Sequence, residues 1–516
     1  MATPAASAQT LGFKAWNLLR MAALGLPVPP AFVIGTHYCH DAASRAAATL
    51  PALWAPGLQA LERAAQGARL GDARQPLLLS VRSGAPVSMP GMMETLLNIG
   101  LCDATVPGLL RQTGNPRLVW DTYRRLVASY GEVVAGVPAA RFDAELAAVA
   151  GGRDERELDF AELRLLTRRC LAAYAQATGL PFPQDPQAQL SGAISAVLAS
   201  WQSAKACDYR RQRGISDSIG TAVTVQTMVY GNAGGRSGSG VGFTRDPVSG
   251  EPALWIDFLF NAQGEDVVSG RRSAHGHQEL AAVLPAVWQT LSEAAATLEQ
   301  AFGDMQDFEF TVQDGRLYLL QTRAGKCTPQ ALVRIALDLL DAGVISRAQA
   351  LERSAGVSAA DLVQLRTLAP DGQPLSPLAH AASASSGVAV GEIAFDEATA
   401  QARHAAGAPV LLLRRDAETA DIAALAWVSG LLTQRGARTS HAAVVARQLG
   451  KVCLVGCAEL QVDSQAGTLQ IGARCLRAGE LLTLDGNDGA VYAGAMQTVA
   501  EPMAALQARL AALRQG

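Results

Sequence analysis

One histidine in the sequence has the neighbours of a phosphate carrier. The stretch Gly436–Arg447 reads Gly-Ala-Arg-Thr-Ser-His-Ala-Ala-Val-Val-Ala-Arg. Thr439 or Ser440 can cap a helix that begins at His441, because hydroxyl oxygens accept hydrogen bonds from the first-turn N–H groups. The positive end of such a helix favours an anion and disfavours a protonated imidazole, so we expect a neutral, nucleophilic His441. This chemistry suits a histidine that accepts a phosphoryl group. The simpler alternative is a histidine that only begins a helix.

An arginine at the end of an apolar run is a candidate phosphate ligand. Arg82 follows the apolar residues 77–81, and its planar guanidinium offers a fork of donors to phosphate oxygens. The alternative is a surface arginine at a strand end. The loop at residues 88–95 follows and reads Ser-Met-Pro-Gly-Met-Met-Glu-Thr, with small and soft side chains.

A glycine-rich segment is a weaker candidate. Residues 231–242 read Gly-Asn-Ala-Gly-Gly-Arg-Ser-Gly-Ser-Gly-Val-Gly, and Gly238 and Gly240 lie near its end. Glycines let backbone N–H groups approach phosphate closely. The segment lacks the Gly-Lys-Ser/Thr ending of a phosphate-binding P-loop, so a flexible turn is an equal alternative.

Acidic residues precede a turn signal that is followed by an arginine. Asp314-Gly315 predicts a hairpin turn, and Asp307 and Glu309 share one face of the strand before it. A two-residue turn would place Gln321 and Arg323 on the opposite face, whereas a three-residue loop from Gln313 to Gly315 would gather all four side chains. Clustered oxygen ligands beside an arginine suit Mg²⁺ bound to nucleotide phosphates. The alternative is a solvated hairpin face.

Hydrophobic periodicity and turn residues predict the elements that position these groups. Residues 1–100 indicate mixed helices and strands, residues 104–215 are mostly helical, and strands return from 221 to about 323. Helical patterns follow at 331–340 and 347–354, and residues 369–387 are rich in Pro, Ser, Ala and Gly, which is typical of a linker. Short strands surround the His441 helix between 388 and 495. A final helix carries Met503, Leu506, Leu510 and Leu513 on one face, which either packs on its own domain or docks a partner.

Composition restricts the class of protein. The 516 residues are 49% hydrophobic and 17% charged with a net charge of −3, which predicts a packed protein of about two to four domains and no nucleic-acid partner. The sequence shows no signal-peptide pattern and no long apolar run, so we expect neither secretion nor a membrane span. The eight cysteines are scattered, which favours a reduced, cytoplasmic location.

Short motifs that together are highly specific occur along nearly the whole sequence. They are Gly12–Leu18 (GFKAWNL), Gly25–Pro30 (GLPVPP), Ser80–Gly84 (SVRSG), Ser88–Met93 (SMPGMM), Pro181–Pro186 (PFPQDP), Asn261–Val268 (NAQGEDVV), Leu320–Arg323 (LQTR) and Thr439–Ala443 (TSHAA). With these motifs the sequence resembles the pyruvate, phosphate dikinase family of PEP-utilising enzymes.

The resemblance implies an α/β multidomain fold. An ATP-grasp nucleotide-binding domain would span residues 1–330, with a mainly helical insert near 104–215. A helical and Pro/Ser/Ala-rich linker would follow at 331–387. A swivelling β/β/α phosphohistidine domain would occupy 388–500, and a C-terminal helix 501–516.

The resemblance also implies roles for single residues. His441 would take the β-phosphoryl group of ATP, with inorganic phosphate accepting the γ-phosphoryl group. The residues implied near ATP and its phosphates are Lys14, Arg82, Gly91, Met92, Met93, Glu265, Asp266 and Arg323, with Arg125 a weaker candidate. Glu309 and Gln321 would lie around Mg²⁺, where the hairpin argument also places Asp307. Thr439 and Ser440 would adjoin the catalytic histidine, with Arg438 beside them in this sequence.

The sequence departs from the family pattern in three places. Ala437 and Arg438 replace the usual Gly-Met before Thr-Ser-His, and Arg438 could bind phosphate or alter how the loop docks. The segment 414–421 differs from the family's Arg-Pro-Glu-Thr-Ser-Pro-Glu-Asp pattern. No eightfold βα pattern follows the phosphohistidine region, so we expect a separate acceptor-binding protein to supply the barrel that binds pyruvate.

Two other functions stay open at this point. One is a subunit of an AMP-forming phosphotransferase with a non-pyruvate acceptor. The other is a phosphohistidine regulatory protein without turnover.

Overall fold

The computed structural model describes two compact units with separate cores. It covers residues 6–87, 89, 92–268, 277–368, 376–416, 423–464, 466–472 and 474–515. Unit 1 is Met1–Ala233 with Tyr318–Gln321, and unit 2 is Gly234–Leu317 with Thr322–Gly516. Helices and strands alternate in both units, so the predicted α/β multidomain class is confirmed. No described helix has both the length and the apolar character needed to cross a bilayer.

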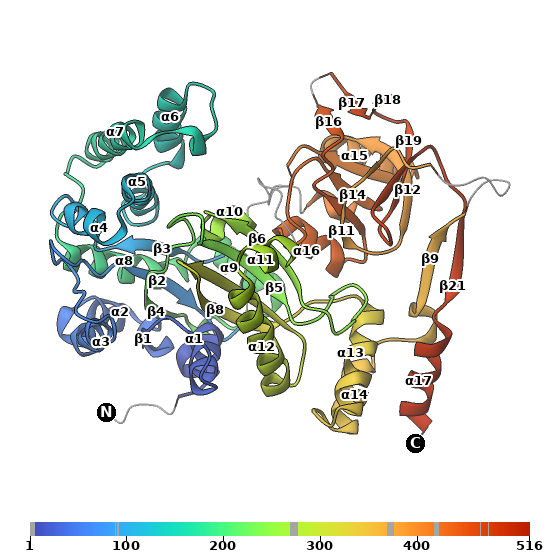
Figure 1. Cartoon of the computed structure of the whole chain (residues 1–516), viewed down its shortest axis with the longest axis horizontal. Helices are drawn as coiled ribbons and strands as arrows, with labels where there is room; N and C mark the ends of the chain where they lie inside the picture. The colour runs from blue at the N-terminus through green and yellow to red at the C-terminus, as the bar shows by residue number, and fades with distance from the viewer. Residues whose placement is uncertain are drawn as a thin grey trace. The chain divides into compact units, whose positions relative to one another are not determined.

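Unit 1 is built on a four-stranded antiparallel sheet in the order β1-β4-β2-β3 (Figure 1). The strands are β1 (Ala31–Ile34), β2 (Leu79–Gly84), β3 (Thr95–Ile99) and β4 (Ala222–Thr227), and the helices before β2 are α1 (Ala8–Ala23), α2 (Ala42–Ala48) and α3 (Pro51–Ala64). Helix α1 is interrupted at Gly12, whose φ of 73° is not helical. The backbone N–H of Phe13 donates to the carbonyl of Ala85 at 3.0 Å, so α1 is fixed at the end of β2.

The chain between β3 and β4 is helical, as the sequence predicts. It contains α4 (Val106–Thr113), α5 (Pro116–Val133), α6 (Ala139–Ala150), α7 (Phe160–Thr178), α8 (Pro186–Ser200) and α9 (Ala204–Arg213). Polar side chains accept hydrogen bonds at several N-termini, among them Asn115, Asp159, Asp185 and Ser203. Left-handed glycines end α4, α6, α7 and α9. Local capping residues therefore set the boundaries of these helices.

Unit 2 begins with a second four-stranded sheet, in the order β6-β5-β7-β8. Its strands are β5 (Gly238–Phe243), β6 (Trp255–Phe260), β7 (Gln306–Gln313) and β8 (Arg316–Ala324), and residues 318–321 of β8 belong to unit 1. Three helices lie between β6 and β7: α10 (Gly264–Val268), α11 (His277–Val283) and α12 (Pro285–Phe302). The strands predicted between 221 and about 323 are present, but the three helices among them were not predicted from the sequence. Val287, Leu291, Ala294 and Leu298 of α12 are buried, and their helical spacing was a signal for this helix.

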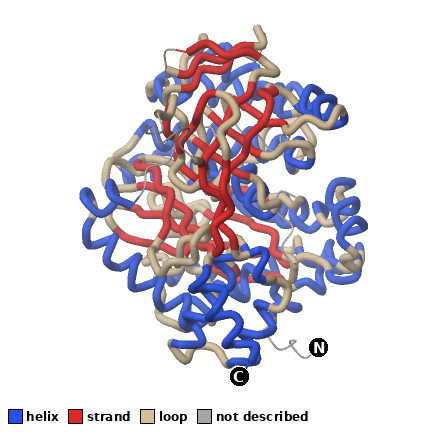
Figure 2. The backbone as a smooth tube through the Cα atoms, turned by 90° about the vertical axis from the view of Figure 1, so that its right-hand side faces the viewer, coloured by secondary structure: helices blue, strands red, loops and turns tan. Residues whose placement is uncertain are grey.

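A helical layer and a two-stranded ribbon follow. Helices α13 (Pro329–Asp341) and α14 (Arg347–Ser354) pack with the C-terminal helix α17 (Ala504–Gln515) in one core, where Leu506, Leu510 and Leu513 are buried. The final apolar stripe thus packs within unit 2. Strands β9 (Val363–Thr367) and β21 (Thr498–Pro502) pair antiparallel beside these helices (Figure 1). Figure 2 views this ribbon from the side, where it runs to the helices near the C-terminus.

The rest of unit 2, residues 376–494, forms what we name the β/β/α domain. Its main sheet has eight strands in the order β10-β20-β19-β12-β13-β14-β15-β11, and a smaller sheet has the order β16-β17-β18. These strands are β10 (Ala379–His380), β11 (Ala382–Ser385), β12 (Val388–Ala394), β13 (Val410–Arg414), β14 (Gly430–Thr433), β15 (Val452–Val455), β16 (Leu460–Asp463), β17 (Thr468–Ile471), β18 (Arg474–Arg477), β19 (Leu481–Asp485) and β20 (Ala490–Ala493). The helices are α15 (Glu397–Ala405) and α16 (His441–Gln448).

Two cores lie on opposite faces of the eight-stranded sheet. Leu411 and Leu413 of β13 belong to a core shared with the smaller sheet, whereas Val410 and Leu412 belong to a core shared with α15 and α16. Because successive strand residues point to opposite faces, the domain has a sheet, a sheet and a helical layer. This confirms the β/β/α prediction.

The predicted linker at 369–387 differs from the structure in its second half. Residues 369–375 lie outside the described part of the chain, but β10 and β11 occupy 379–385 and pair with β20 and β15. Backbone hydrogen bonds to partners far along the chain thus override a composition typical of linkers.

Candidate functional site

The predicted helix start is present at His441. Helix α16 begins at this residue, and the Oγ of Ser440 accepts a hydrogen bond from the N–H of Ala443 at 3.4 Å. Ser440, rather than Thr439, is therefore the N-cap. Ala442 and Ala443 are buried in the core beneath the helix. The side chain of His441 itself lies outside the described part of the chain.

The loop before His441 binds strand β6. The guanidinium of Arg438 donates from Nε to Asp257 Oδ1 at 3.1 Å and from Nη2 to the carbonyl of Ile256 at 2.9 Å. The N–H of Thr439 donates to Asp257 Oδ2 at 2.9 Å. The guanidinium carbon of Arg438 also lies 4.0 Å from the ring centre of Trp255. Of the two roles open for Arg438, these contacts support docking.

Arg447, near the end of α16, supports the same loop from within the β/β/α domain. It is buried, and it donates from Nε to the carbonyl of Ala384 at 2.7 Å and from Nη2 to the carbonyl of Arg438 at 3.2 Å. The backbone at Arg438 is therefore held on one side by Arg447 and on the other by β6.

Asp307 and Arg323 form an ion pair in the four-stranded sheet of unit 2, with Arg323 Nε 2.8 Å from Asp307 Oδ2. Burial raises the pKa of Asp307, and the neighbouring guanidinium of Arg323 opposes this shift. Burial acts against the charge of Arg323, but the carboxylates of Asp307 and Glu309 outweigh it and raise the pKa of Arg323. Arg323 is therefore protonated under all ordinary conditions.

The hairpin that carries these residues has the shorter of the two predicted turns. Strand β7 ends at Gln313 and β8 begins at Arg316, and Asp314 and Gly315 have φ values of 51° and 77°. Such a turn was expected to separate Asp307 from Arg323. Arg323 nevertheless reaches Asp307, so the expected separation of these two side chains was wrong. Gln321 lies in the part of β8 that belongs to unit 1.

The chemistry of the acidic residues fits Mg²⁺. Asp307 and Glu309 alternate on β7 and so share a face, and carboxylate oxygens are ligands that this hard cation prefers. Among the described residues, no group of three or more His, Cys, Asp or Glu side chains is placed to hold a metal alone. Mg²⁺ commonly binds through one or two carboxylates and completes its shell with phosphates and water, which matches this small donor set.

Two of the predicted phosphate ligands of unit 1 lie near one end of β2. Arg82 lies on β2 and Lys14 on α1, and both side chains are half-buried. The Cβ of Lys14 lies 3.7 Å from the position that a Cβ on Gly84 would take. Met92 and Met93 pack at the edge of the unit 1 core. Gly91 lies outside the described residues.

Arg125 lies in a network of charges on α5. It forms ion pairs with Asp121 at 3.0 Å and Glu155 at 2.9 Å, and Arg124 contacts the same two carboxylates. These contacts provide a structural reason for Arg125, and its role in phosphate binding stays a prediction.

The glycine-rich segment is partly a strand rather than a loop. Gly238 and Gly240 are buried in β5, where an added Cβ would lie 2.2 Å from the ring of Phe258 and 2.5 Å from the ring of Phe310, respectively. The glycines make room for aromatic side chains, so the alternative of a flexible turn is wrong for residues 238–242. Phosphate binding by Gly238 and Gly240 stays a prediction.

Glu265 and Asp266 lie in the short helix α10. Glu265 is exposed and Asp266 half-buried, and Asp266 Oδ2 accepts a hydrogen bond from the N–H of Gln263 at 2.9 Å. Asp266 therefore caps the start of its own helix, and the predicted proximity of both residues to the nucleotide remains a prediction.

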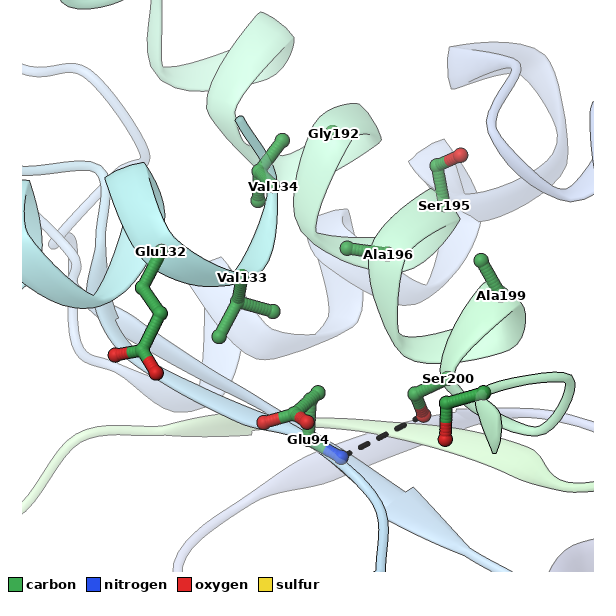
Figure 3. A pocket seen from close by; sticks show the side chains of 10 residues that line it. Glu94, Glu132, Val133, Val134, Gly192, Ser195, Ala196, Ala199 and Ser200 are labelled. Carbon is green, nitrogen blue, oxygen red and sulfur yellow. Dashed lines mark hydrogen bonds between the residues drawn. The ribbon is translucent and has the colours of Figure 1, made fainter. Parts of the chain in front are cut away.

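A pocket of about 560 Å³ in unit 1 lies between α5 and α8. Glu94 and Glu132 face it together with Ser195 and Ser200 (Figure 3), and the N–H of Glu94 donates to Ser200 Oγ at 3.5 Å. Its two carboxylates disfavour phosphate groups. The pocket therefore does not replace the site predicted from the sequence.

Asp257 is a functional candidate that sequence reasoning missed. It lies in the run Trp-Ile-Asp-Phe-Leu-Phe at 255–260, where it is the only charged residue. A lone carboxylate in a buried strand requires a partner, and this was an available signal. The partner itself, Arg438, is 181 residues away.

Comparison with known proteins places these features in a family. Residues 58–278 and 275–342 match the model described as "Pyruvate phosphate dikinase, AMP/ATP-binding domain", and residues 407–489 match "PEP-utilising enzyme, mobile domain". The chain is 41% identical over 491 residues to pyruvate, phosphate dikinase 2 of Zea mays and 40% identical over 499 residues to pyruvate, phosphate dikinase of Clostridium symbiosum.

These alignments include 94% and 95% of this chain but 56% of each relative, so the chain spans about half the length of the curated relatives that it matches. The ATP-binding match alone covers more than half of the 516 residues. The chain therefore belongs to the pyruvate phosphate dikinase family.

Proposed function

We propose that the protein is a phosphotransferase that uses ATP and inorganic phosphate to phosphorylate His441. The imidazole nitrogen forms a bond to the β-phosphorus of ATP, and the bond from that phosphorus to the AMP oxygen breaks. The γ-phosphoryl group passes to inorganic phosphate. The products are phosphohistidine, AMP and pyrophosphate.

The single observation that carries this proposal is the placement of His441 at the capped start of α16, in a chain whose family matches are an ATP-binding and a mobile domain. Positioning and charge stabilisation account for most phosphoryl-transfer catalysis. Lys14, Arg82 and Arg323 are proposed to hold the phosphates, with Met92, Met93, Glu265 and Asp266 nearby.

Asp307 and Glu309, with Gln321 as a further ligand, are proposed to hold Mg²⁺. The cation would neutralise the charge on the nucleotide phosphates. Arg323 keeps Asp307 in place through their ion pair, so it orients a ligand as well as supplying a charge.

We propose that the phosphoryl group then passes from His441 to pyruvate on a separate acceptor-binding protein. The mobile-domain match at residues 407–489 supports a carrier that visits more than one site. A different acceptor alcohol or enol would leave the first half-reaction unchanged.

Labelling with β-³²P ATP, Mg²⁺ and phosphate tests the first half-reaction. We expect a protein-bound label that is labile to acid and stable to base, together with AMP and pyrophosphate. His441→Ala should abolish the label, whereas His404→Ala, which removes an exposed histidine of α15, should retain it. A label that persists in His441→Ala rules out the assignment.

The same labelled protein tests delivery. Pyruvate and a candidate acceptor-binding protein should together discharge the label and form phosphoenolpyruvate. Discharge by another acceptor indicates the alternative phosphotransferase, and failure of the wild-type chain to bind ATP in calorimetry indicates a regulatory protein.

A further inference from the structure

Two residues from distant parts of the chain meet where the His441 loop contacts β6. Each carboxylate oxygen of Asp257 accepts one hydrogen bond, Oδ1 from the Arg438 guanidinium and Oδ2 from the Thr439 N–H. Arg438 uses a second nitrogen for the carbonyl of Ile256. The contact therefore fixes both the side chain and the backbone of the loop.

Because Asp257 is buried, breaking this contact is costly. The side chain of Asp257 is 2% exposed and that of Arg438 is 22% exposed. A buried carboxylate is costly unless it is paired and hydrogen-bonded. Asp257 is paired and hydrogen-bonded only while Arg438 and Thr439 contact β6. If the loop moved away from β6, the buried carboxylate would lose both donors.

The contact divides into a part that stays with the β/β/α domain and a part that can separate. Arg447 bonds to Ala384 and to the carbonyl of Arg438, all within the β/β/α domain. Asp257, Ile256 and Trp255 belong to β6. Release of the domain from β6 would break the Arg438 and Thr439 bonds to β6 and the contacts of the Arg447 guanidinium with the rings of Trp255 and Phe243. The hydrogen bonds of Arg447 would stay intact.

We propose that Arg438 is a positioning residue, and that its pairing with Asp257 latches the His441 loop onto β6 for phosphoryl transfer from the nucleotide. This inference rests on the proposed function for its catalytic consequence. The latch acts three residues before His441, at the loop that supplies the N-cap of α16. It favours the docked state for loading and must open before delivery.

Hydrogen exchange on the full-length chain tests the latch without any catalytic assay. Arg438→Met removes the donors and keeps an unbranched side chain of the type usual in the family. Because hydrogen bonds to charged groups are among the stronger ones, we expect amide exchange in residues 436–440 to accelerate by roughly tenfold. Exchange in α5 and α7 of unit 1 should not change.

The matched control is Arg435→Met. Arg435 is exposed in the same loop, and its side chain has no ion pair among the described residues, so its exchange pattern should equal that of the wild type. Equal exchange in Arg438→Met and Arg435→Met would overturn the proposal. Asp257→Asn is a second variant. It removes the carboxylate that accepts from Arg438 and Thr439, so it should accelerate exchange of the same amides.

A kinetic measurement separates positioning from general stability. In single-turnover labelling at a temperature where the variant is folded, Arg438→Met should slow phosphorylation of His441 roughly tenfold at saturating ATP, with the Kd for ATP unchanged. Arg438→Lys keeps the charge but not the planar fork, and should recover part of the rate. An unchanged rate at saturating ATP contradicts the positioning role. Absence of labelling in the wild type would reject the proposed function, while the exchange result would still decide whether the latch exists.

Discussion

Three buried aspartates of the described chain are each held by arginine. Asp121 faces Arg124 and Arg125, Asp257 faces Arg438, and Asp307 faces Arg323. Ion pairs in such surroundings contribute little net stability, but removal of one partner leaves a buried charge and is costly. These ion pairs therefore favour the packing in which the two partners are in contact.

Asp121 provides a test of this effect through pH. Burial opposes its ionisation, but Arg124 and Arg125 outweigh burial and lower the pKa of Asp121 below its usual value. Asp121→Asn should cost about 3 kcal/mol of unfolding free energy at neutral pH. A lowered pKa in the folded state means that the stabilisation is present above about pH 4, the unfolded value, and is lost as pH falls through the folded pKa.

The measurement is urea-dependent hydrogen exchange of α5 at a series of pH values. The penalty should be constant from pH 7 to about pH 4 and shrink below it. Asp208→Asn, which removes an exposed carboxylate of α9, should cost little at any pH. A penalty for Asp121→Asn that grows on acidification would contradict this account.

From the sequence, Asp307 and Arg323 were predicted to meet only with a three-residue loop, yet they pair across a two-residue turn. Nothing in the sequence indicated the Asp257–Arg438 pair, because 181 residues separate the partners. Spacing restricts local geometry, whereas these two contacts depend on the tertiary fold.

At the scale of elements, the backbones of α1 and β2 approach so closely that only glycine fits at position 12. A Cβ on Gly12 would lie 1.8 Å from the carbonyl oxygen of Gly84. The backbone of Gly12 has φ 73° and ψ 153°, a region that is almost restricted to glycine. Helix α1 can therefore cross the end of β2 only with glycine at this position.

Gly12→Ala should lower the unfolding free energy of unit 1 by at least about 3 kcal/mol, since strain and steric overlap add. Gly25→Ala is the matched control. Gly25 has a similar φ of 74°, but no atom lies within 4 Å of the added Cβ, so it should cost only about 1 kcal/mol. Chemical denaturation of both variants gives the comparison, and equal costs would show that the overlap at Gly84 is relieved by movement.

Element types were predicted best where capping residues and periodicity agree, as in the helical insert. They were predicted poorly where tertiary hydrogen bonds decide the outcome. Residues 379–385 have a linker-like composition, but they pair with β20 and β15. Gly238 and Gly240 resemble a flexible loop in the sequence, yet they are strand positions that accommodate the rings of Phe258 and Phe310.

At the scale of the whole molecule, the cores are separate. Unit 1 has one large core, whereas the β/β/α domain has its own two cores on either face of its main sheet. Proteins with several cores commonly unfold in more than one step. The pairing of β9 with β21 could not be predicted from the sequence, because it joins the segments that precede and follow the β/β/α domain.

Two core substitutions test this independence. Leu126→Ala in unit 1 and Leu432→Ala in the β/β/α domain each truncate a fully buried leucine and should each cost about 3 kcal/mol. In scanning calorimetry we expect at least two transitions, with each substitution lowering only the transition of its own core. If both variants shift every transition equally, the chain is a single cooperative unit.

The ribbon of β9 and β21 restricts how the proposed histidine carrier could move. Five residue pairs from Thr498↔Thr367 to Pro502↔Val363 join the incoming and outgoing chain next to α13, α14 and α17. A domain attached by a single flexible linker could rotate in every direction. Two hydrogen-bonded strands resist twisting, so they would allow bending mainly in one direction. If the β/β/α domain moves as proposed, the ribbon would confine that movement to an arc and so raise the effective concentration of His441 at the sites along it.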